Sequence, residues 1–321
     1  MNDLSFSPRA HWRATRVTMQ RNLAAAPRPL AERAVKAGLR LAGALLRWRP
    51  LEAMLEERAW RPRLETIELR MPGLPAGFDG LRILHVSDTH LGSRHHRLAG
   101  RIRDLLDGVS ADLVTFTGDA NCDALESPPE IGAQWLAHAL SGVQAPLGTF
   151  AVLGNHDPAG MVEALEAWGI RVLANEHAIV RRGGDAICIA GTDDPHAFWT
   201  PGADATLAHA PKDFYRIALI HSAACREAAA REGFQLYLCG HTHGGQICLR
   251  PGRPLLALFG TALGFASGVW REGRMIGHTS RGLGTSSLPV RIQCPPAATL
   301  IVLRAGPASA GAAAFPMDNP N

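Results

Sequence analysis

The sequence lacks two signals that direct a chain into or across a membrane. It has no run of about 18 consecutive apolar residues, since even residues 41–46 are bounded by Arg40 and Arg47. Its first residues also lack the apolar stretch and the small-residue cleavage site of a secretory signal peptide. We therefore expect neither a membrane-spanning helix nor a secreted protein.

Paired cysteines are also missing. The six cysteines include no CxxC pair and form no dense framework. In a chain of 321 residues, scattered cysteines are typical of free thiols in a reducing compartment. We expect a cytoplasmic protein whose length suffices for one large domain with a hydrophobic core and an appended segment.

A net positive charge is absent from most of the chain. The formal charge of +4 arises in residues 1–63, which hold 13 Lys and Arg against 5 Asp and Glu, a charge of +8. The remaining residues hold 20 against 24, a charge of −4. Because the net positive charge is confined to one segment, a general nucleic-acid-binding function is not supported, and we expect no stable nucleic-acid partner.

The basic segment is predicted to be an arm followed by amphipathic helices. Residues 1–29 have the composition of a flexible basic arm or a transit peptide, and we favour the arm. On a helical wheel of residues 30–49, the cations of one face fall within a wedge of about 60°: Arg33, Lys36, Arg40 and Arg47. Residues 30–60 fit either binding to an anionic membrane surface, which would hold the protein peripherally on the inner face of the cell membrane, or packing on the protein's own domain.

From residue 64 onward, short apolar runs alternate with helical stretches. Residues 64–70 alternate with period 2, as a half-buried strand does. The pattern predicts further strands at 81–86, 113–117, 149–153, 216–220 and 236–239, and helices at 98–107, 133–140 and 161–168. Such an order predicts a layered α/β or α+β domain with its site at the strand ends.

Each of the last five predicted strands runs into a potential metal ligand. These ligands are Asp88 and His90, Asp119, Asn155, His221, and the closely spaced pair His241 and His243. Mixed imidazole, carboxylate and amide ligands favour manganese, iron or zinc over the all-oxygen shells of calcium. Five independent accidents would have to coincide to produce this pattern by chance, so the sequence predicts a metal site.

The order of these motifs resembles the calcineurin-like metallophosphoesterase superfamily over about residues 64–304. The matching motifs are Asp88-x-His90, Gly118-Asp119, Gly154-Asn-His-Asp157, His221 and Gly240-His-x-His243. The resemblance implies two β-sheets sandwiched together and flanked by helices. Residues 240–246 and 280–286 are similar to a bacterial subgroup of membrane-associated phosphodiesterases, some of which are UDP-2,3-diacylglucosamine pyrophosphatases. We expect a basic helical extension at 1–63, the catalytic domain at 64–305 and a disordered tail at 306–321.

The resemblance also implies how the ligands are shared between two divalent ions, with manganese favoured and zinc or iron as alternatives. Asp88, His90 and His243 would bind one ion, Asn155, His221 and His241 the other, and Asp119 would bridge them. A metal-activated hydroxide would then attack phosphorus in line. His156 would be the general acid, or would only contact the phosphate electrostatically, and Asp157 would orient its imidazole and raise its pKa.

Together these features favour a binuclear metal-dependent phosphoester hydrolase that acts on a lipid-linked or nucleotide-sugar substrate at a membrane surface. One alternative is a soluble phosphodiesterase for nucleotides or nucleic acid. Another is a non-catalytic interaction scaffold of the same fold, although such relatives usually lose ligands that this chain retains. Phe198 and Trp199 fit either an aromatic wall beside the substrate or core packing.

Overall fold

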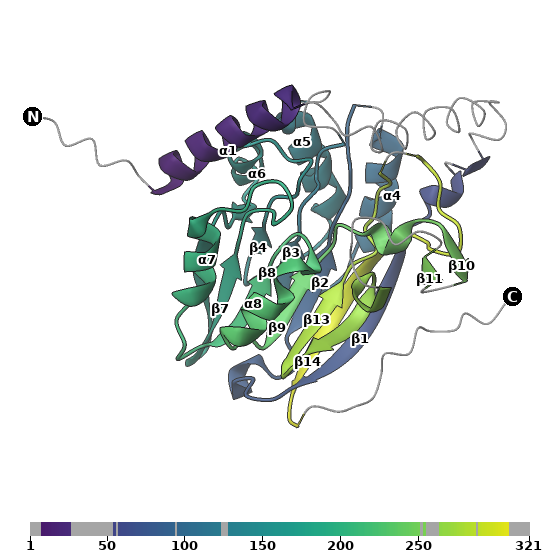
Figure 1. Cartoon of the computed structure of the whole chain (residues 1–321). Helices are drawn as coiled ribbons and strands as arrows, with labels where there is room; N and C mark the ends of the chain where they lie inside the picture. The colour runs from purple at the N-terminus through teal and green to yellow at the C-terminus, as the bar shows by residue number, and fades with distance from the viewer. Residues whose placement is uncertain are drawn as a thin grey trace, which may run out of the picture.

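A computed structural model describes most of the predicted catalytic domain and part of the basic segment. The described residues are 8–26, 54–55, 57–93, 95–122, 128–250, 253–254, 263–286 and 288–307. The helix predicted over residues 30–49 and most of the predicted tail lie outside them. Within the described residues, two six-stranded sheets pack face to face with helices on their outer sides (Figure 1). The predicted two-sheet sandwich is confirmed.

The first sheet has the strand order β1-β14-β2-β3-β4-β5. Its strands are β1 (Arg63–Met71), β2 (Arg82–Val86), β3 (Leu113–Phe116), β4 (Thr149–Ala151), β5 (Arg171–Val172) and β14 (Ala297–Ala305). Strands β2 to β5 run parallel to one another, whereas β14 is antiparallel to β2. The carboxyl ends of β2, β3 and β4 therefore meet at one edge of this sheet.

The second sheet has the order β12-β13-β9-β8-β7-β6. Its strands are β6 (Glu176–Arg182), β7 (Asp185–Gly191), β8 (Tyr215–Leu219), β9 (Leu236–Cys239), β12 (Gly268–Glu272) and β13 (Met275–Thr279). Strands β7, β8, β9 and β13 are parallel, so the carboxyl ends of β8 and β9 also share an edge. A separate short hairpin pairs β10 (Cys248–Arg250) with β11 (Arg253–Pro254).

The helices cover both outer faces of the sandwich. Helices α4 (His96–Leu106), α5 (Pro129–Leu140) and α6 (Met161–Glu166) pack on the first sheet, and α7 (Pro201–Ala208) and α8 (Arg226–Arg231) pack on the second. Strand alternation explains the layers: Ile83 of β2 faces the core between the sheets, whereas its neighbour Leu84 packs with Ile102 of α4. None of the helices in the described part of the chain combines the length and apolar character that a bilayer crossing requires.

The basic segment contains a helix that the sequence pattern did not predict. Helix α1 (Pro8–Ala25) lies beside α6 at the upper end of the molecule in Figure 1. Trp12 and Arg16 on this helix are buried. The prediction of a flexible arm is therefore wrong for residues 8–25, because one face of this stretch packs against the two-sheet domain.

A chain of buried hydrogen bonds crosses between the two sheets. Nδ1 of His85 in β2 lies 2.9 Å from Nδ1 of His278 in β13. Nε2 of His85 is 3.0 Å from Oγ1 of Thr117, which in turn donates to Ser87 Oγ at 2.8 Å. Burial lowers the pKa of His85 well below its usual range and that of His278 to about 3. Both rings are therefore neutral in the folded protein.

This pair makes the fold sensitive to acid. The folded pKa of His278 lies below the ordinary value of 6.5, so the unfolded chain binds the proton more tightly and stability falls as the pH drops below about 6.5. As the pH falls from 8 to 5, protonation of His278 in the unfolded chain should lower the free energy of unfolding by about 2 kcal/mol. In urea titrations, His278→Gln should reduce the acid-induced loss by that amount. The exposed His177→Gln is the control, and an equal pH dependence in wild type and His278→Gln would contradict the prediction.

Candidate metal centre

The seven candidate ligands all lie in turns that follow parallel strands. Asp88 and His90 follow β2, Asp119 follows β3, and Asn155 follows β4, all in the first sheet; His221 follows β8, and His241 and His243 follow β9, in the second. Because these strand ends lie at adjacent edges of the two packed sheets, the turns converge. The structure brings all seven side chains together.

The first group contains Asp88, His90 and His243. Each offers one ligand atom, and these atoms lie within 4.8 Å of one another. Nε2 of His90 is 3.0 Å from Nε2 of His243, which lies 3.6 Å from Oδ1 of Asp88. All three residues are buried. Their grouping is the one that the resemblance implies for one of the two ions.

The second group contains Asp119, His221 and His241, whose ligand atoms likewise lie within 4.8 Å of one another. The amide oxygen of Asn155 joins them, at 3.1 Å from Nε2 of His221 and 3.1 Å from Nδ1 of His241. This set supplies imidazole, amide and carboxylate atoms around one point. Such a donor set fits a borderline divalent ion.

Asp119 belongs to the second group and also faces the first. Its Oδ2 is 3.3 Å from Nε2 of His221 in one group and 3.6 Å from Nε2 of His90 in the other. The carboxylate is 2 % exposed, so it can interact with little besides these neighbours. Its position between the groups is the one a bridging ligand requires.

The backbone is strained at the candidate ligands. Eight non-glycine residues in the described part of the chain have positive φ, and five are candidate ligands: Asp88, His90, Asp119, His241 and His243. Each such conformation costs on the order of 1–3 kcal/mol and persists only where the surroundings enforce it. The fold therefore holds these residues in unfavourable backbone conformations that bring their side chains together, as functional sites do.

Two glycines let the backbone approach the carboxylates closely. A Cβ on Gly154 would overlap Oδ1 of Asp119, and a Cβ on Gly240 would overlap Oδ2 of Asp88. Each glycine precedes a candidate ligand in the sequence, namely Asn155 and His241. Steric overlap with a buried carboxylate thus explains why a glycine stands at each position, and the sequence alone does not reveal this contact.

The buried carboxylates create a need for positive charge. Burial, together with repulsion from Asp119, raises the pKa of Asp88 to about 7. Burial alone would also raise the pKa of Asp119, but the imidazoles of His221, His156 and His90 outweigh it and hold that pKa well below the usual range. A cation in the site would stabilise both ionised carboxylates.

The imidazoles are largely in the form that binds metal. Burial lowers the pKa of His90 to about 3 and the pKa values of His241 and His243 well below their usual range. For His221, burial opposes protonation, but the carboxylate of Asp119 outweighs it and raises the pKa. Three of the four rings are therefore neutral, and a neutral imidazole carries the lone pair that coordinates a metal.

Backbone carbonyl groups fix the orientation of two of these rings. Nδ1 of His90 lies 3.2 Å from the carbonyl oxygen of Asn121, and Nδ1 of His221 lies 2.7 Å from that of Thr117. A carbonyl only accepts hydrogen bonds, so each Nδ1 carries a hydrogen and Nε2 is the ring atom that points into the site.

His156 lies at the side of the cluster. Its ring packs edge-on against the ring of His90, with centroids 5.0 Å apart, and its backbone N–H donates to Oδ1 of Asp119 at 2.9 Å. The side chain is partly exposed, unlike the buried rings of the two groups. It is therefore accessible to a molecule bound beside the candidate metal ligands.

Asp157 does not have the partner that the sequence suggested. Its carboxylate accepts from the backbone N–H groups of four residues: Asp119 at 2.7 Å, Ala120 at 2.9 Å, Asn121 at 3.1 Å and Gly154 at 2.9 Å. Within the described residues, the imidazole of His156 is not among its hydrogen-bond partners. Asp157 thus ties the turn after β4 to the turn after β3 instead of orienting His156.

The sequence reasoning missed a buried arginine behind the site. Arg291 donates to the carbonyl groups of Gly284 at 2.6 Å and Arg281 at 2.8 Å. The N–H of Gly284 in turn donates to the carbonyl of Asp88 at 2.7 Å. Arg291 therefore holds residues 280–284 against the turn after β2 that carries Asp88 and His90. Phe198, for which two roles were open, is buried beneath the guanidinium of Arg16.

The comparisons with known proteins agree with this geometry. A sequence model of the family described as calcineurin-like phosphoesterase matches residues 81–245. YkuE of Bacillus subtilis (strain 168), an uncharacterized metallophosphoesterase, is 29% identical over 258 residues, which cover 75% of this chain and 86% of YkuE. The phosphodiesterase YaeI of Escherichia coli (strain K12) is 32% identical over 177 residues, covering 51% of this chain and 63% of YaeI.

A third relative has a substrate in its name. LpxG of Chlamydia trachomatis, a UDP-2,3-diacylglucosamine pyrophosphatase, is 38% identical over 101 residues, which cover 31% of this chain and 30% of LpxG. The family match spans just over half of this chain and includes every turn that carries a candidate ligand. The chain therefore belongs to the calcineurin-like phosphoesterase family and is a metallophosphoesterase.

Proposed function

We propose that this metallophosphoesterase binds two divalent ions, manganese being favoured, and hydrolyses a phosphodiester or pyrophosphate bond in a lipid-linked substrate. The observation that carries the proposal is the meeting of two ligand groups at the Asp119 carboxylate. Asp88, His90 and His243 hold one ion, and Asn155, His221 and His241 hold the other. Asp119 contacts both.

The charge of the site suits an anionic substrate. Two divalent ions carry four positive charges, and Asp88 and Asp119 supply two negative ones. The excess positive charge attracts a phosphate group into a buried site, where electrostatic attraction is weakly screened. When bound, such ions polarise phosphoryl oxygens and lower the pKa of water, so that a nucleophile is available near neutral pH.

His156 serves as the proton donor to the leaving oxygen. Its ring lies against His90 and is partly exposed, whereas the rings of the candidate ligands are buried. A proton donor has to lie near the bond that breaks without being consumed as a metal ligand, and the position of His156 beside the candidate ligands supports this role. Asp157 supports it indirectly, because it fixes the backbone of the turn that carries His156.

A lipid-linked substrate is supported by the relatives and by the basic segment. LpxG acts on a UDP-linked diacyl sugar and YaeI is a phosphodiesterase, so both a pyrophosphate and a phosphodiester fall within the chemistry of similar proteins. Residues 30–60 carry the cationic face expected to bind anionic headgroups, which would bring the site to the membrane surface. The location that follows is cytoplasmic and peripheral on the membrane.

The ion site predicts a specific effect on stability. Mn²⁺ at 100 times its dissociation constant should stabilise the wild-type protein by about 2.7 kcal/mol. Asp88→Asn removes a buried charge, so at pH 8 it should raise the melting temperature of the metal-free protein and lose more than half of the stabilisation by Mn²⁺. Thermal unfolding with and without Mn²⁺ measures the melting temperature and the stabilisation by the ion, with the exposed Asp104→Asn as control. An unchanged response of Asp88→Asn to Mn²⁺ would argue against this ligand.

The acid role of His156 predicts that its loss depends on the leaving group. His156→Ala should reduce kcat by about 10²–10⁴ on an alkyl phosphodiester, whose leaving group needs a proton. The loss should be much smaller on bis(4-nitrophenyl) phosphate, whose leaving group departs as an anion. Steady-state kinetics with both substrates checks this, with bound Mn²⁺ quantified in parallel and the exposed His177→Ala as control. Equal losses on the two substrates would leave His156 with only an electrostatic role.

The membrane proposal is tested on the full chain, because α1 packs on the catalytic domain and removal of residues 1–63 would delete it. Changing Arg33, Lys36, Arg40 and Arg47 to Gln should weaken binding to phosphatidylserine vesicles by more than tenfold, since each cation contributes about 1 kcal/mol. Activity on bis(4-nitrophenyl) phosphate should not change, whereas activity on a vesicle-bound UDP-linked diacyl sugar should fall. Unchanged vesicle binding, or faster turnover of a soluble nucleotide than of the lipid, would favour a soluble phosphodiesterase.

A further inference from the structure

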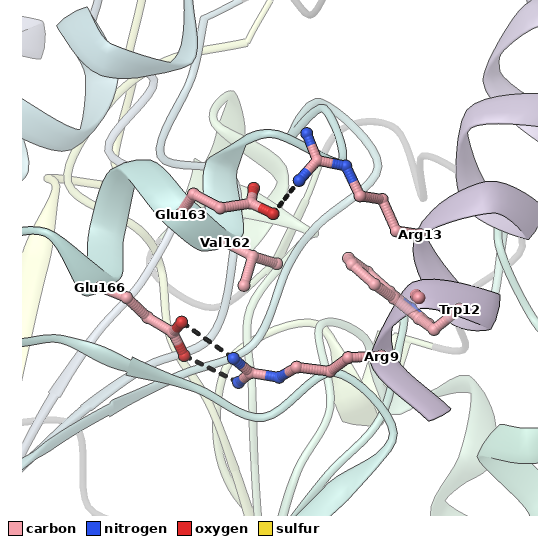
Figure 2. Close-up of a pocket in the computed structure, with 7 residues that line it drawn as sticks. Arg9, Trp12, Arg13, Val162, Glu163 and Glu166 are labelled. Carbon is pink, nitrogen blue, oxygen red and sulfur yellow. Dashed lines mark hydrogen bonds and ion pairs between the residues drawn. The ribbon is translucent and has the colours of Figure 1, made fainter. Parts of the chain in front are cut away.

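Helix α1 is held to the catalytic domain along one face. Arg9 forms two hydrogen bonds with the carboxylate of Glu166, at 2.7 and 2.9 Å, and Arg13 pairs with Glu163 (Figure 2). These ion pairs flank a recess of ≈ 260 Å³ between α1 and α6. The side chains of both pairs are at least 30% exposed, so they contribute little stability. The position of α1 therefore depends mainly on its buried residues.

The buried residues of α1 reach a loop of the second sheet. Trp12 Nε1 donates to Oδ2 of Asp193 at 2.7 Å, and Arg16 forms an ion pair with the same carboxylate. The guanidinium of Arg16 also lies over the ring of Phe198, 3.9 Å from its centroid. Asp193 and Phe198 both belong to the loop of residues 192–198, which follows β7.

The same guanidinium reaches a turn of the first sheet. Arg16 donates to the carbonyl groups of Gly154 at 2.8 Å and Asp157 at 2.6 Å. These two carbonyls bracket Asn155 and His156, the proposed ligand and the proposed acid. One side chain thus fixes both ends of the turn that carries two functional groups.

The loop after β7 also touches the site. His196 in this loop stacks on the ring of His241, with centroids 4.4 Å apart and an angle of 21° between the planes. Arg16 therefore connects a turn of the first sheet with a loop of the second. The turn carries His156 and the loop carries His196, and both rings lie against candidate metal ligands. The two sheets have separate hydrogen-bond ladders, so a link at their ends limits how far these loops can move apart.

Arg16 contributes less to stability than an apolar residue of similar volume would. It is 1% exposed, and burial lowers its pKa to about 10, so it remains charged at neutral pH. A buried ion pair stabilises a protein little compared with apolar residues of similar volume. Its planar guanidinium, however, has five N–H donors in a fixed arrangement and can bond several acceptors at once. That property suits the positioning of two loops better than it suits stability.

We propose that α1 is part of the active site and that Arg16 is a positioning residue, which holds the Asn155–His156 turn and the 192–198 loop in their catalytic arrangement. The inference rests on the proposed function, because it takes Asn155 as a metal ligand and His156 as the acid. Helix α1 precedes the segment that the family model matches, so the proposal extends the active site beyond that segment.

The matched variants are Arg16→Lys and Arg13→Lys in the full chain. The two arginines lie on the same helix, and each variant keeps its charge while losing the guanidinium; only Arg16 reaches the turn after β4. Three measurements are made: hydrogen exchange of peptides covering residues 150–160 and 190–200 in metal-free protein, Mn²⁺ affinity by equilibrium dialysis, and kcat and KM on bis(4-nitrophenyl) phosphate.

Arg16→Lys should speed exchange in both peptides at least tenfold, because a lysine cannot hold both carbonyls and Asp193 together. It should weaken Mn²⁺ binding and lower kcat by about 10–100-fold, as changes to groups that orient metal ligands do. KM should change less than about threefold, since Arg16 lies behind the turn and not in contact with substrate. Arg13→Lys should match wild type in all three measurements.

The inference is overturned if Arg16→Lys folds with wild-type exchange rates, Mn²⁺ affinity and kcat, or if Arg13→Lys shows the same losses. If wild type binds no Mn²⁺ and hydrolyses no phosphodiester, the proposed function fails, while the exchange rates still decide whether Arg16 holds the two loops. Should Arg16→Lys fail to fold, Asp193→Asn decides: it keeps the size of the side chain but removes the charge that pairs with Arg16, and unchanged exchange at residues 190–200 would overturn the proposal.

Discussion

The arrangement of the site depends on the buried carboxylate of Asp119. One of its oxygens lies between the imidazoles of His221 and His90, and the other accepts the backbone N–H of His156. Its own backbone N–H donates to Asp157, whose carboxylate ties together the turns after β3 and β4. Gly154 leaves room for this contact, and the strained backbone of Asp119 directs the side chain inward. The surrounding turns are therefore shaped around one negative charge placed between two sets of imidazole rings.

The strands that deliver ligands were predictable because each combines an apolar run with a polar cluster at its end. Strands β2, β3, β4, β8 and β9 and helices α4, α5 and α6 lie close to their predicted positions. The other strands of the described residues, apart from β1, were not predicted: β5, β6, β7, β10, β11, β12, β13 and β14. The partners of β14 are far away in the sequence: Ile301 pairs with Ile67 and Ile83. Pairings of this kind depend on the three-dimensional fold, and a local pattern does not contain them.

Two errors in the sequence reasoning share a cause. Asp157 follows His156 directly, and this adjacency suggested a contact between their side chains, but the tight turn directs the Asp157 carboxylate to backbone N–H groups instead. Helix α1 looked like a solvated arm because its packed face carries Arg9, Arg13 and Arg16. Their acidic partners lie 150 to 177 residues further along the chain. In both cases the side chain is matched to a partner that only the fold brings near.

The place of α1 in the chain has a consequence for biosynthesis. A ribosome makes this helix before every strand of the sandwich, yet the groups that receive its buried face come from loops after β4 and β7. The nascent helix therefore has no docking surface until both loops have emerged and their sheets have formed, since long-range contacts are made late. During that interval its tryptophan and arginines are exposed to solvent and to chaperones. The docking of α1 on the finished sandwich is then a late step in folding.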